Sequence, residues 1–315
     1  MKKFFALLLV FCTLFGLVAC RDDDTPDTPD TPDTPAVSTY SLAIAIESVE
    51  LSSRSGKKLG NNFAAVVFDA DGKIVAATFD STEINAPTLD ESGALVAQEI
   101  ASKVESEYKK GQMAATWGEQ ATAFANYIKG KTAAEVGALT ITNELIAGCT
   151  MVSESYSSAL NLQALVVKAG ASERKVTFES ATADFTLGGG MNVSVAKNWK
   201  GNVEVTADCA GAVVGADGKV IATVIDSAIQ TYSLAEGALV LGAISESKLA
   251  LGDSYEGDTP MPAGRWYNQV AVFKNTAVGK TAADLADIPT EFESGCTINV
   301  TGYKAVLIEA VNNAK

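Results

Sequence analysis

Apolar residues that alternate with other residues mark several strands along the chain. From residue 40 to residue 51 the alternation is clearest between Leu42 and Ile46, as expected for a strand with one buried face. Residues 191–195 and 203–209 favour strands by the same pattern.

A helical spacing of apolar residues marks the other elements. Residues 117–124 and 266–273 place aromatic and aliphatic side chains on one helical face, where they pack in a core or stack on a planar cofactor. A further helix is predicted after residue 150 and after residue 297. Their predicted core positions are Ala159, Leu162, Leu165, Val166, Ala305, Val306, Ile308 and Val311. The mixture predicts an α+β fold with antiparallel hairpins packed against helices.

The chain repeats itself at an offset of about 147 residues. Residues 66–76 recur as residues 213–222. Other matching pairs are Asp80 and Asp226, Trp117 and Trp266, Gln120 and Gln269, Phe124 and Phe273, Gly-Lys-Thr at 130–132 and 279–281, and Gly-Cys-Thr at 148–150 and 295–297. We therefore predict two tandem homologous domains, over residues 39–172 and 173–315.

Two Asp-Gly pairs predict tight turns between strands. Asp71-Gly72 and Asp217-Gly218 each lie between apolar runs, which is a strong hairpin signal. A calcium loop needs its glycine at the sixth position, whereas here it is the fourth, and Gly215 stands where the second copy needs its first ligand. The turn interpretation is favoured.

The Gly-Lys-Thr runs at 130–132 and 279–281 superficially resemble a phosphate-binding loop. The glycine which that loop requires five residues upstream is Ala125 in one copy and Lys274 in the other. We instead predict that a helix ends at each glycine and that each threonine caps the next helix. The capping pairs are Thr132 with Glu135 and Thr281 with Asp284.

Residues 1–20 predict an export signal. Lys2 and Lys3 precede an apolar run over 4–18, which is shorter than the roughly 20 residues of a membrane-spanning helix. The run ends in Leu-Val-Ala before Cys20, which resembles the bacterial lipobox. We expect the signal to be removed and a lipid on Cys20 to hold an extracytoplasmic protein on a membrane or cell surface.

Residues 21–38 predict a disordered tether. Repeats of Asp-Thr-Pro leave almost no apolar surface to bury and place a proline at every third position. Such a segment favours an extended, charged spacer of about 3 Å per residue.

Composition excludes several kinds of chemistry. The formal net charge is −14, which argues against a nucleic-acid partner. The chain has no histidine, which excludes Ser-His-Asp and Cys-His catalysis and histidine-ligated metals. A pair of catalytic carboxylates stays open, although no motif marks one. Together these observations favour a binding or electron-transfer protein over an enzyme.

Three cysteines remain outside the signal and its cleavage site. Cys149, Cys209 and Cys296 are isolated in apolar surroundings, without a Cys-x-x-Cys pair. Cys149 and Cys296 occupy matching repeat positions, so we expect each to pack inside its own copy as a small hydrophobic residue. A disulfide between them would require the two copies to lie face to face.

Residues 291–297, Glu-Phe-Glu-Ser-Gly-Cys-Thr, and the Ala- and Val-rich helix after them resemble the C-terminal signature of extracellular FMN-binding domains. That signature has an acidic residue, two spacers, Ser-Gly-Ala-Thr and then such a helix. The Asp-Gly-Lys hairpin is similar to the opening of the same domains. The chain also resembles repeat lipoproteins of anaerobic bacteria that carry the Asp-Gly-Lys, Trp-x-x-Gln and Gly-Lys-Thr blocks.

The resemblance implies that Thr297 carries FMN through a phosphoester made by a flavin transferase, with Ser294, Gly295 and Glu291 around it. Cys296 stands where the family has alanine. In the first copy Gly148 and Thr150 are the matching candidates, where Ala147 replaces the serine. The alternative is a strand-to-helix turn, with both threonines as polar residues near a helix start.

Two functions follow from the sequence. One is an electron-transfer lipoprotein, in which FMN exchanges electrons with a redox partner. The other is a cofactor-free surface module that binds a small ligand, a glycan or a neighbouring protein.

Overall fold

The structure is a computed structural model. It describes residues 37–53, 56–109, 113, 115–142, 145–147, 149, 158–181, 184–257, 261–292 and 295–315. Residues 36–315 cluster as one compact unit by their contacts. The export signal, Cys20 and all of the tether except its last two residues lie outside the described residues.

The first part of the chain supplies one sheet and three helices. Its elements are β1 (Ser38–Ser53), β2 (Gly56–Asp69), β3 (Ile74–Asn85), α1 (Trp117–Ile128), α2 (Ala133–Gly137), α3 (Ser158–Ala171) and β4 (Val176–Ser180). The sheet is antiparallel with strand order β3-β2-β1-β4.

Among the described residues, the second part repeats the order of three strands and three helices, adds a short strand, a short helix and a 3₁₀ turn, and contains no counterpart of β4. Its elements are β5 (Phe185–Lys197), β6 (Val203–Gly215), β7 (Val220–Ala235), β8 (Ala238–Leu241), α4 (Lys248–Leu251), the 3₁₀ turn η1 (Gly252–Tyr255), α5 (Trp266–Ala277), α6 (Ala282–Ala286) and α7 (Thr301–Asn312). This sheet is also antiparallel, with order β5-β6-β7-β8. The fold is therefore a mixture of helices and antiparallel sheets, as predicted.

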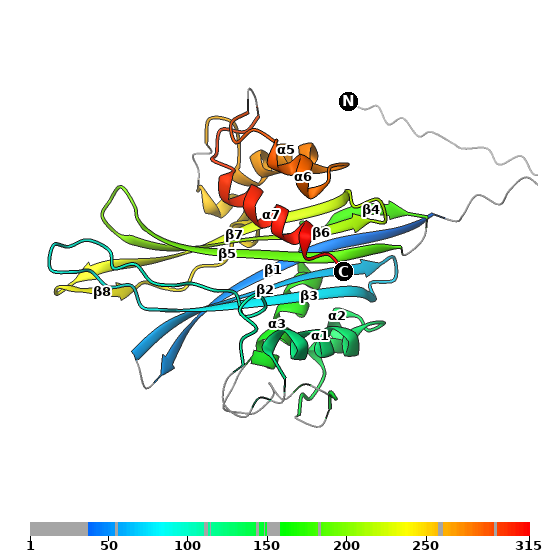
Figure 1. The fold of residues 1–315 in the computed structure, drawn as a ribbon, viewed down its shortest axis with the longest axis horizontal. Coiled ribbons are helices and arrows are strands. Elements are labelled where there is room, and N and C mark those ends of the chain that lie inside the picture. The colour runs from blue at the N-terminus through cyan, green and yellow to red at the C-terminus, as the bar shows by residue number, and fades with distance from the viewer. Residues whose placement is uncertain are drawn as a thin grey trace, which may run out of the picture. The chain divides into compact units, whose positions relative to one another are not determined.

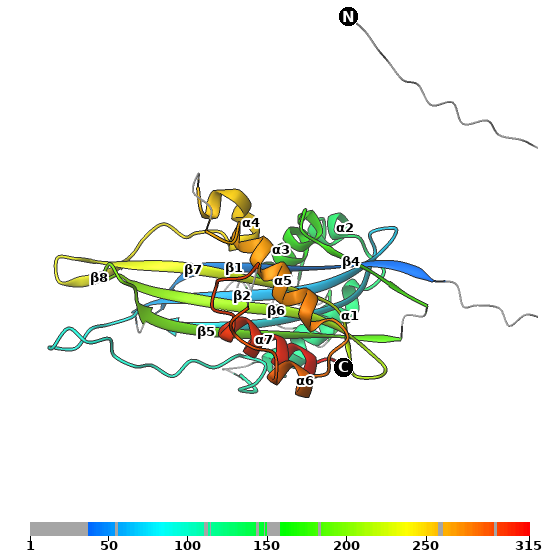
Figure 2. The same cartoon turned by 90° about the horizontal axis from the view of Figure 1, so that it is seen from above.

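The two sheets lie face to face between two layers of helices. Figure 1 shows α5, α6 and α7 over the sheet of β5 to β8, and α1, α2 and α3 under the sheet of β1 to β4. Figure 2, turned by 90°, shows the strands of the two sheets running in a similar direction. Two hydrophobic clusters of described residues fill the space between the sheets, and a separate core lies under each helical layer.

Strand β1 is buried on both faces because it lies inside this four-layer arrangement. Leu42, Ile44 and Ile46 point into the core between the sheets, whereas Ala43 and Ala45 pack under the helices. All five are at most 5% exposed. The alternation in the sequence thus separates large from small apolar residues, and it does not mark a strand with one solvent face.

Glycines in β5 let a helix approach the strand very closely. A Cβ atom on Gly188 would lie 1.8 Å from the carbonyl oxygen of Ala310, and one on Gly190 would lie 2.1 Å from that of Val306. Both contacts are with the backbone of α7. Any larger side chain would push α7 away from the sheet.

The Asp-Gly pairs form the predicted hairpin turns. Gly72 joins β2 to β3 and Gly218 joins β6 to β7, each with a φ of +76°. This left-handed conformation costs glycine little.

The Gly-Lys-Thr runs connect each hairpin to its helices. The carbonyl of Ile74 accepts from Gly130 N at 2.8 Å, and Ile74 N donates to Lys131 O at 2.8 Å. Val220 makes the same two bonds with Gly279 and Lys280. Thr132 and Thr281 then form the predicted capping boxes of α2 and α6. The recurrence of this motif therefore has a structural explanation.

Helix α7 packs differently from the predicted stripe. Val306 and Val311 are buried and Ile308 is half-buried, as predicted. The prediction for Ala305 was wrong, because Ala305 is exposed and Leu307 is the fully buried neighbour. The helix starts at Thr301, and its buried face also includes Ala310.

Strand β4 belongs to the first sheet although it lies beyond residue 172, where the sequence analysis placed the start of the second copy. Phe178 pairs with Tyr40 and Val176 pairs with Leu42. The repeat in the structure therefore begins again at β5, and residues 172–181 connect the two parts.

The cysteines pack as predicted. Cys149 lies in the core under the first helical layer and Cys296 in the core under the second, so they occupy different layers. Cys209 is buried between the sheets. Among the described residues, no helix is long and apolar enough to cross a bilayer.

Candidate functional site

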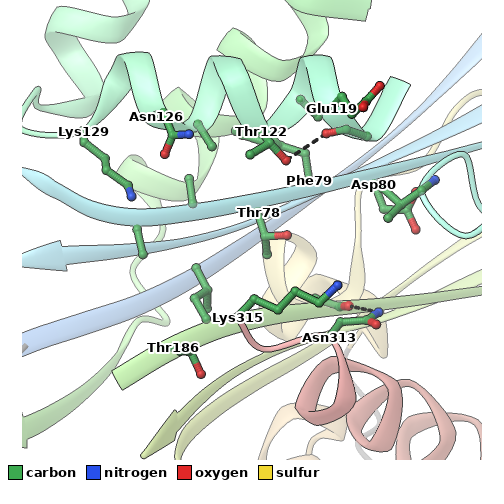
Figure 3. Close-up of a pocket in the computed structure, with 18 of the residues that line it drawn as sticks. Thr78, Phe79, Asp80, Glu119, Thr122, Asn126, Lys129, Thr186, Asn313 and Lys315 are labelled. Atoms are coloured by element: carbon green, nitrogen blue, oxygen red, sulfur yellow. Dashed lines mark hydrogen bonds between the residues drawn. The ribbon is translucent and has the colours of Figure 1, made fainter. Parts of the chain in front are cut away.

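A cleft of about 860 Å³ opens at the edge of the sandwich where β3 and β5 lie side by side. Figure 3 shows α1 forming one wall and the residues after α7 forming the other. The lining includes six consecutive residues of β3 from Val75 to Asp80, and Phe185, Thr186, Leu187 and Gly189 of β5. The position follows from the topology, because β3 and β5 are the edge strands of their sheets.

The cleft carries mixed chemistry. Thr122 and Asn126 come from successive turns of α1, Lys129 follows the last residue of this helix, and all three are exposed. Lys315 extends from the opposite wall, where Asn313 Nδ2 donates to Gly189 O at 3.1 Å. Apolar strand surface, hydroxyl groups and cations thus surround one cavity, which is the usual composition of a ligand site.

Asp80 is a buried carboxylate at one end of the cleft. Its Oδ1 accepts from Ser81 N at 2.7 Å and from Val104 N at 3.3 Å. Burial raises its pKa to about 6, although the hydrogen bond with the Ser102 side chain acts in the opposite direction. The carboxylate therefore holds the segment around Ser102 against the edge of β3.

Asp226 makes the equivalent hydrogen bonds in the second part. Its Oδ1 accepts from Ser227 N at 2.7 Å and from Leu249 N at 2.9 Å, and burial raises its pKa to about 6. The Ser247 side chain bonds to it as Ser102 does to Asp80. The sequence analysis matched Asp80 with Asp226 but missed the second half of the contact, Ser-Lys at 102–103 and 247–248. The sequence signal for this contact was that the Ser-Lys pair occurs in both copies.

Lys248 lies among aromatic rings inside the second helical layer. Its Nζ donates to Tyr303 OH at 3.2 Å and lies 5.1 Å and 5.2 Å from the ring centroids of Tyr255 and Trp266. Burial lowers its pKa, and the nearby Asp208 carboxylate opposes that shift. Because none of these residues lines the cleft, we assign the cluster to packing between α4, α5 and α7.

Thr297 lies in an exposed turn before α7. Gln269 Oε1 accepts from Thr297 N at 2.7 Å and from Thr297 Oγ1 at 3.1 Å. Gly295 has a φ of +76°, and Glu291 is exposed at the start of the same segment. The structure thus brings the Trp-x-x-Gln block and the Gly-Cys-Thr block into contact.

The remaining residues of the sequence-predicted site cannot be placed. Ser294, Gly148 and Thr150 lie outside the described residues. None of Glu291, Gly295 and Thr297 is among the residues that line the cleft. Thr297 is thus an exposed residue, but its hydroxyl donates to Gln269 and the residue does not line the described cleft.

Comparison with protein-family descriptions, curated proteins and solved structures found no match to this chain.

Proposed function

We propose that this chain is a lipid-anchored extracytoplasmic binding module whose ligand site is the cleft between α1, β3 and β5. The observation that carries the proposal is the cleft itself, with apolar strand residues below and Thr122, Asn126, Lys129 and Lys315 around it. A concave site with a few polar groups over an apolar floor suits a small ligand, a glycan or a segment of a neighbouring protein.

The proposed location rests on the sequence at the start of the chain. The apolar run before Cys20 and the Asp-Thr-Pro tether favour a lipid on Cys20 and a spacer between the membrane and the folded unit. We also infer that the fold arose as two tandem homologous domains. The matched order of β1 to α3 and β5 to α7 supports this, with the refinement that β4 is a connecting strand.

A substitution that blocks the cleft tests the binding function, and a matching substitution outside the cleft is the control. Asn126 on α1 lines the cleft, and Asn275 is its counterpart on α5, exposed and outside the cleft lining. We would screen the mature protein by thermal shift against sugars, amino acids, nucleotides and short peptides. A ligand that stabilises the wild type and Asn275→Trp but not Asn126→Trp supports the proposal. If no compound in the screen stabilises one tryptophan variant more than the other, the result contradicts the proposal.

A flavin on Thr297 is a second candidate, and the exposure of that residue favours it. The residues fit the attachment step in part, because Thr297 is exposed and Gly295 of the motif lies in the same loop with a φ of +76°. When bound, FMN would supply reversible electron transfer. The described cleft does not adjoin Thr297, so the structure offers an attachment point without a described pocket for the ring system.

A further inference from the structure

The open edge of β5 corresponds to an edge of β1 that is already occupied. The repeat offset places residues 185–189 of β5 on residues 38–42 of β1. In β1 residues 38–42 pair with β4 on one side, and residues 40–42 pair with β2 on the other. Among the described residues, β5 pairs only with β6. Its other edge borders the cleft, where Gly189 O accepts from Asn313 Nδ2 and residues 185–188 have no described neighbouring strand paired to them.

The burial of β7 and the burial of its counterpart β3 show the same difference between the two parts of the chain. Ala222 and Val224 of β7 face the core between the sheets and are 1–2% exposed, and β4 packs against this strand. Their counterparts in β3, Ala76 and Thr78, are only half-buried and line the cleft. The cleft is therefore the place where the first part of the chain lacks the cover that β4 gives to the second part.

The course of the chain after α3 indicates where a strand that pairs with the open edge of β5 would begin. Three residues after α3, Arg174 stacks on Tyr267 of α5 with 3.7 Å between its Cζ atom and the ring centroid, and β4 begins two residues later. Three residues after α7, Lys315 lies at the wall of the cleft. Counted from the end of the preceding helix, Lys315 holds the position of Arg174, which lies two residues before β4.

We propose that the cleft accepts an extended segment of a partner polypeptide, which adds to β5 as an antiparallel strand as β4 adds to β1. Strand addition uses the unpaired backbone groups of a sheet edge for affinity and alternate side chains for specificity. This inference rests on the proposed function and narrows its ligand to a polypeptide strand.

Strand β4 indicates which side chains the partner would carry. Val176 and Phe178 point toward the space between the sheets, and Phe178 is 7% exposed between the rings of Tyr40 and Phe185. Thr177 and Glu179 are exposed. The partner segment should alternate apolar and polar residues in the same way. The chain's own tether does not fit, because a proline at every third position removes the backbone donors that pairing needs.

The test uses a synthetic peptide with the sequence of residues 175–181 and the mature protein. Fluorescence anisotropy measures binding, and backbone hydrogen exchange locates it. We expect protection of residues 185–189, at least about ten-fold weaker binding to Asn126→Trp, and unchanged binding to Asn275→Trp. A peptide with proline in place of Thr177, or aspartate in place of Phe178, should lose binding to a similar extent.

Several outcomes would overturn the inference. They are an absence of binding, protection of residues 75–79 of β3 or residues 38–42 of β1 in place of 185–189, and equal binding to both tryptophan variants. Self-association that Asn126→Trp abolishes while the peptide fails to bind would identify a second copy as the occupant and would also overturn it. If the peptide fails while a small ligand still stabilises the protein in a cleft-dependent way, the proposed function stands and only the strand inference falls.

Discussion

Gln269 holds Thr297 in place through two hydrogen bonds, from the backbone amide at 2.7 Å and from the hydroxyl at 3.1 Å, both accepted by Oε1. The Gln269 side chain is fully buried, and its Nε2 donates to Gly264 O at 2.8 Å. One buried amide thus connects the start of α5 with the turn before α7.

Replacing this amide should cost more stability than removing the hydroxyl. Gln269→Leu leaves the Thr297 amide and the Gly264 carbonyl without their partner, for an expected loss of about 1–3 kcal/mol in the free energy of unfolding. Thr297→Val removes only the hydroxyl bond, with an expected loss of about 1 kcal/mol or less. Urea denaturation measures both values. Equal losses for the two variants would show that the amide is not the main connection.

The buried aspartates predict that stability falls as the pH rises. Burial raises the pKa of Asp80 and Asp226 to about 6, and that of Glu309 to about 7. A raised carboxyl pKa means that the folded state binds more protons than the unfolded state above pH 4, so protonation stabilises the fold. We expect the protein to lose about 1 kcal/mol for each of the two buried aspartates between pH 5 and pH 7.

Asp226→Asn removes one of these groups while keeping an oxygen acceptor for the Leu249 amide. The variant should therefore show a smaller loss of stability between pH 5 and pH 7 than the wild type. A wild type that becomes more stable across this range would contradict the assignment.

The close approach of α7 to β5 predicts a severe effect at one glycine. Gly188→Ala would place a Cβ 1.8 Å from Ala310 O and 2.6 Å from Ala314 N, both backbone atoms. We expect a loss of about 2 kcal/mol or more. Gly118→Ala, whose Cβ would lie 3.7 Å from its nearest neighbour in Val104, should be neutral or stabilising by up to about 1 kcal/mol. Thermal unfolding of both variants would distinguish them, and comparable losses would argue against the close packing.

The flavin candidate makes a direct chemical prediction. If Thr297 bears FMN, protein purified from the native host carries the mass of an FMN phosphoester on the peptide that contains Thr297. A Thr297→Ala protein lacks that mass, whereas Thr301→Ala, a substitution at the first residue of α7, retains it. Unmodified Thr297 in a host with an active flavin transferase would refute covalent attachment.

Much of the fold was predictable because its signals are local. The Asp-Gly turns and the capping boxes of Thr132 and Thr281 depend on residues a few positions apart, and each formed where predicted. The repeat also located the helices that begin at Trp117 and Trp266.

The stacking of the two sheets was not predictable from these local signals. Ala43 and Ala45 look like the weaker face of a half-exposed strand, yet helices cover them. The buried Lys248 looks like any lysine in sequence, because its aromatic neighbours Trp266 and Tyr303 are distant along the chain. The cleft has no local sequence signal either, because its position depends on which strand edge β4 pairs with.

Cysteine labelling on intact cells of the native host tests the central claim most directly. Asn126→Cys and Asn275→Cys place matched thiols inside and outside the cleft, and the described native cysteines are buried. If the cleft binds a partner at the cell surface, a membrane-impermeant maleimide labels the Asn275 variant on cells, while the Asn126 variant is protected there and reacts only after purification. Equal labelling of both variants on cells would contradict a ligand in the cleft.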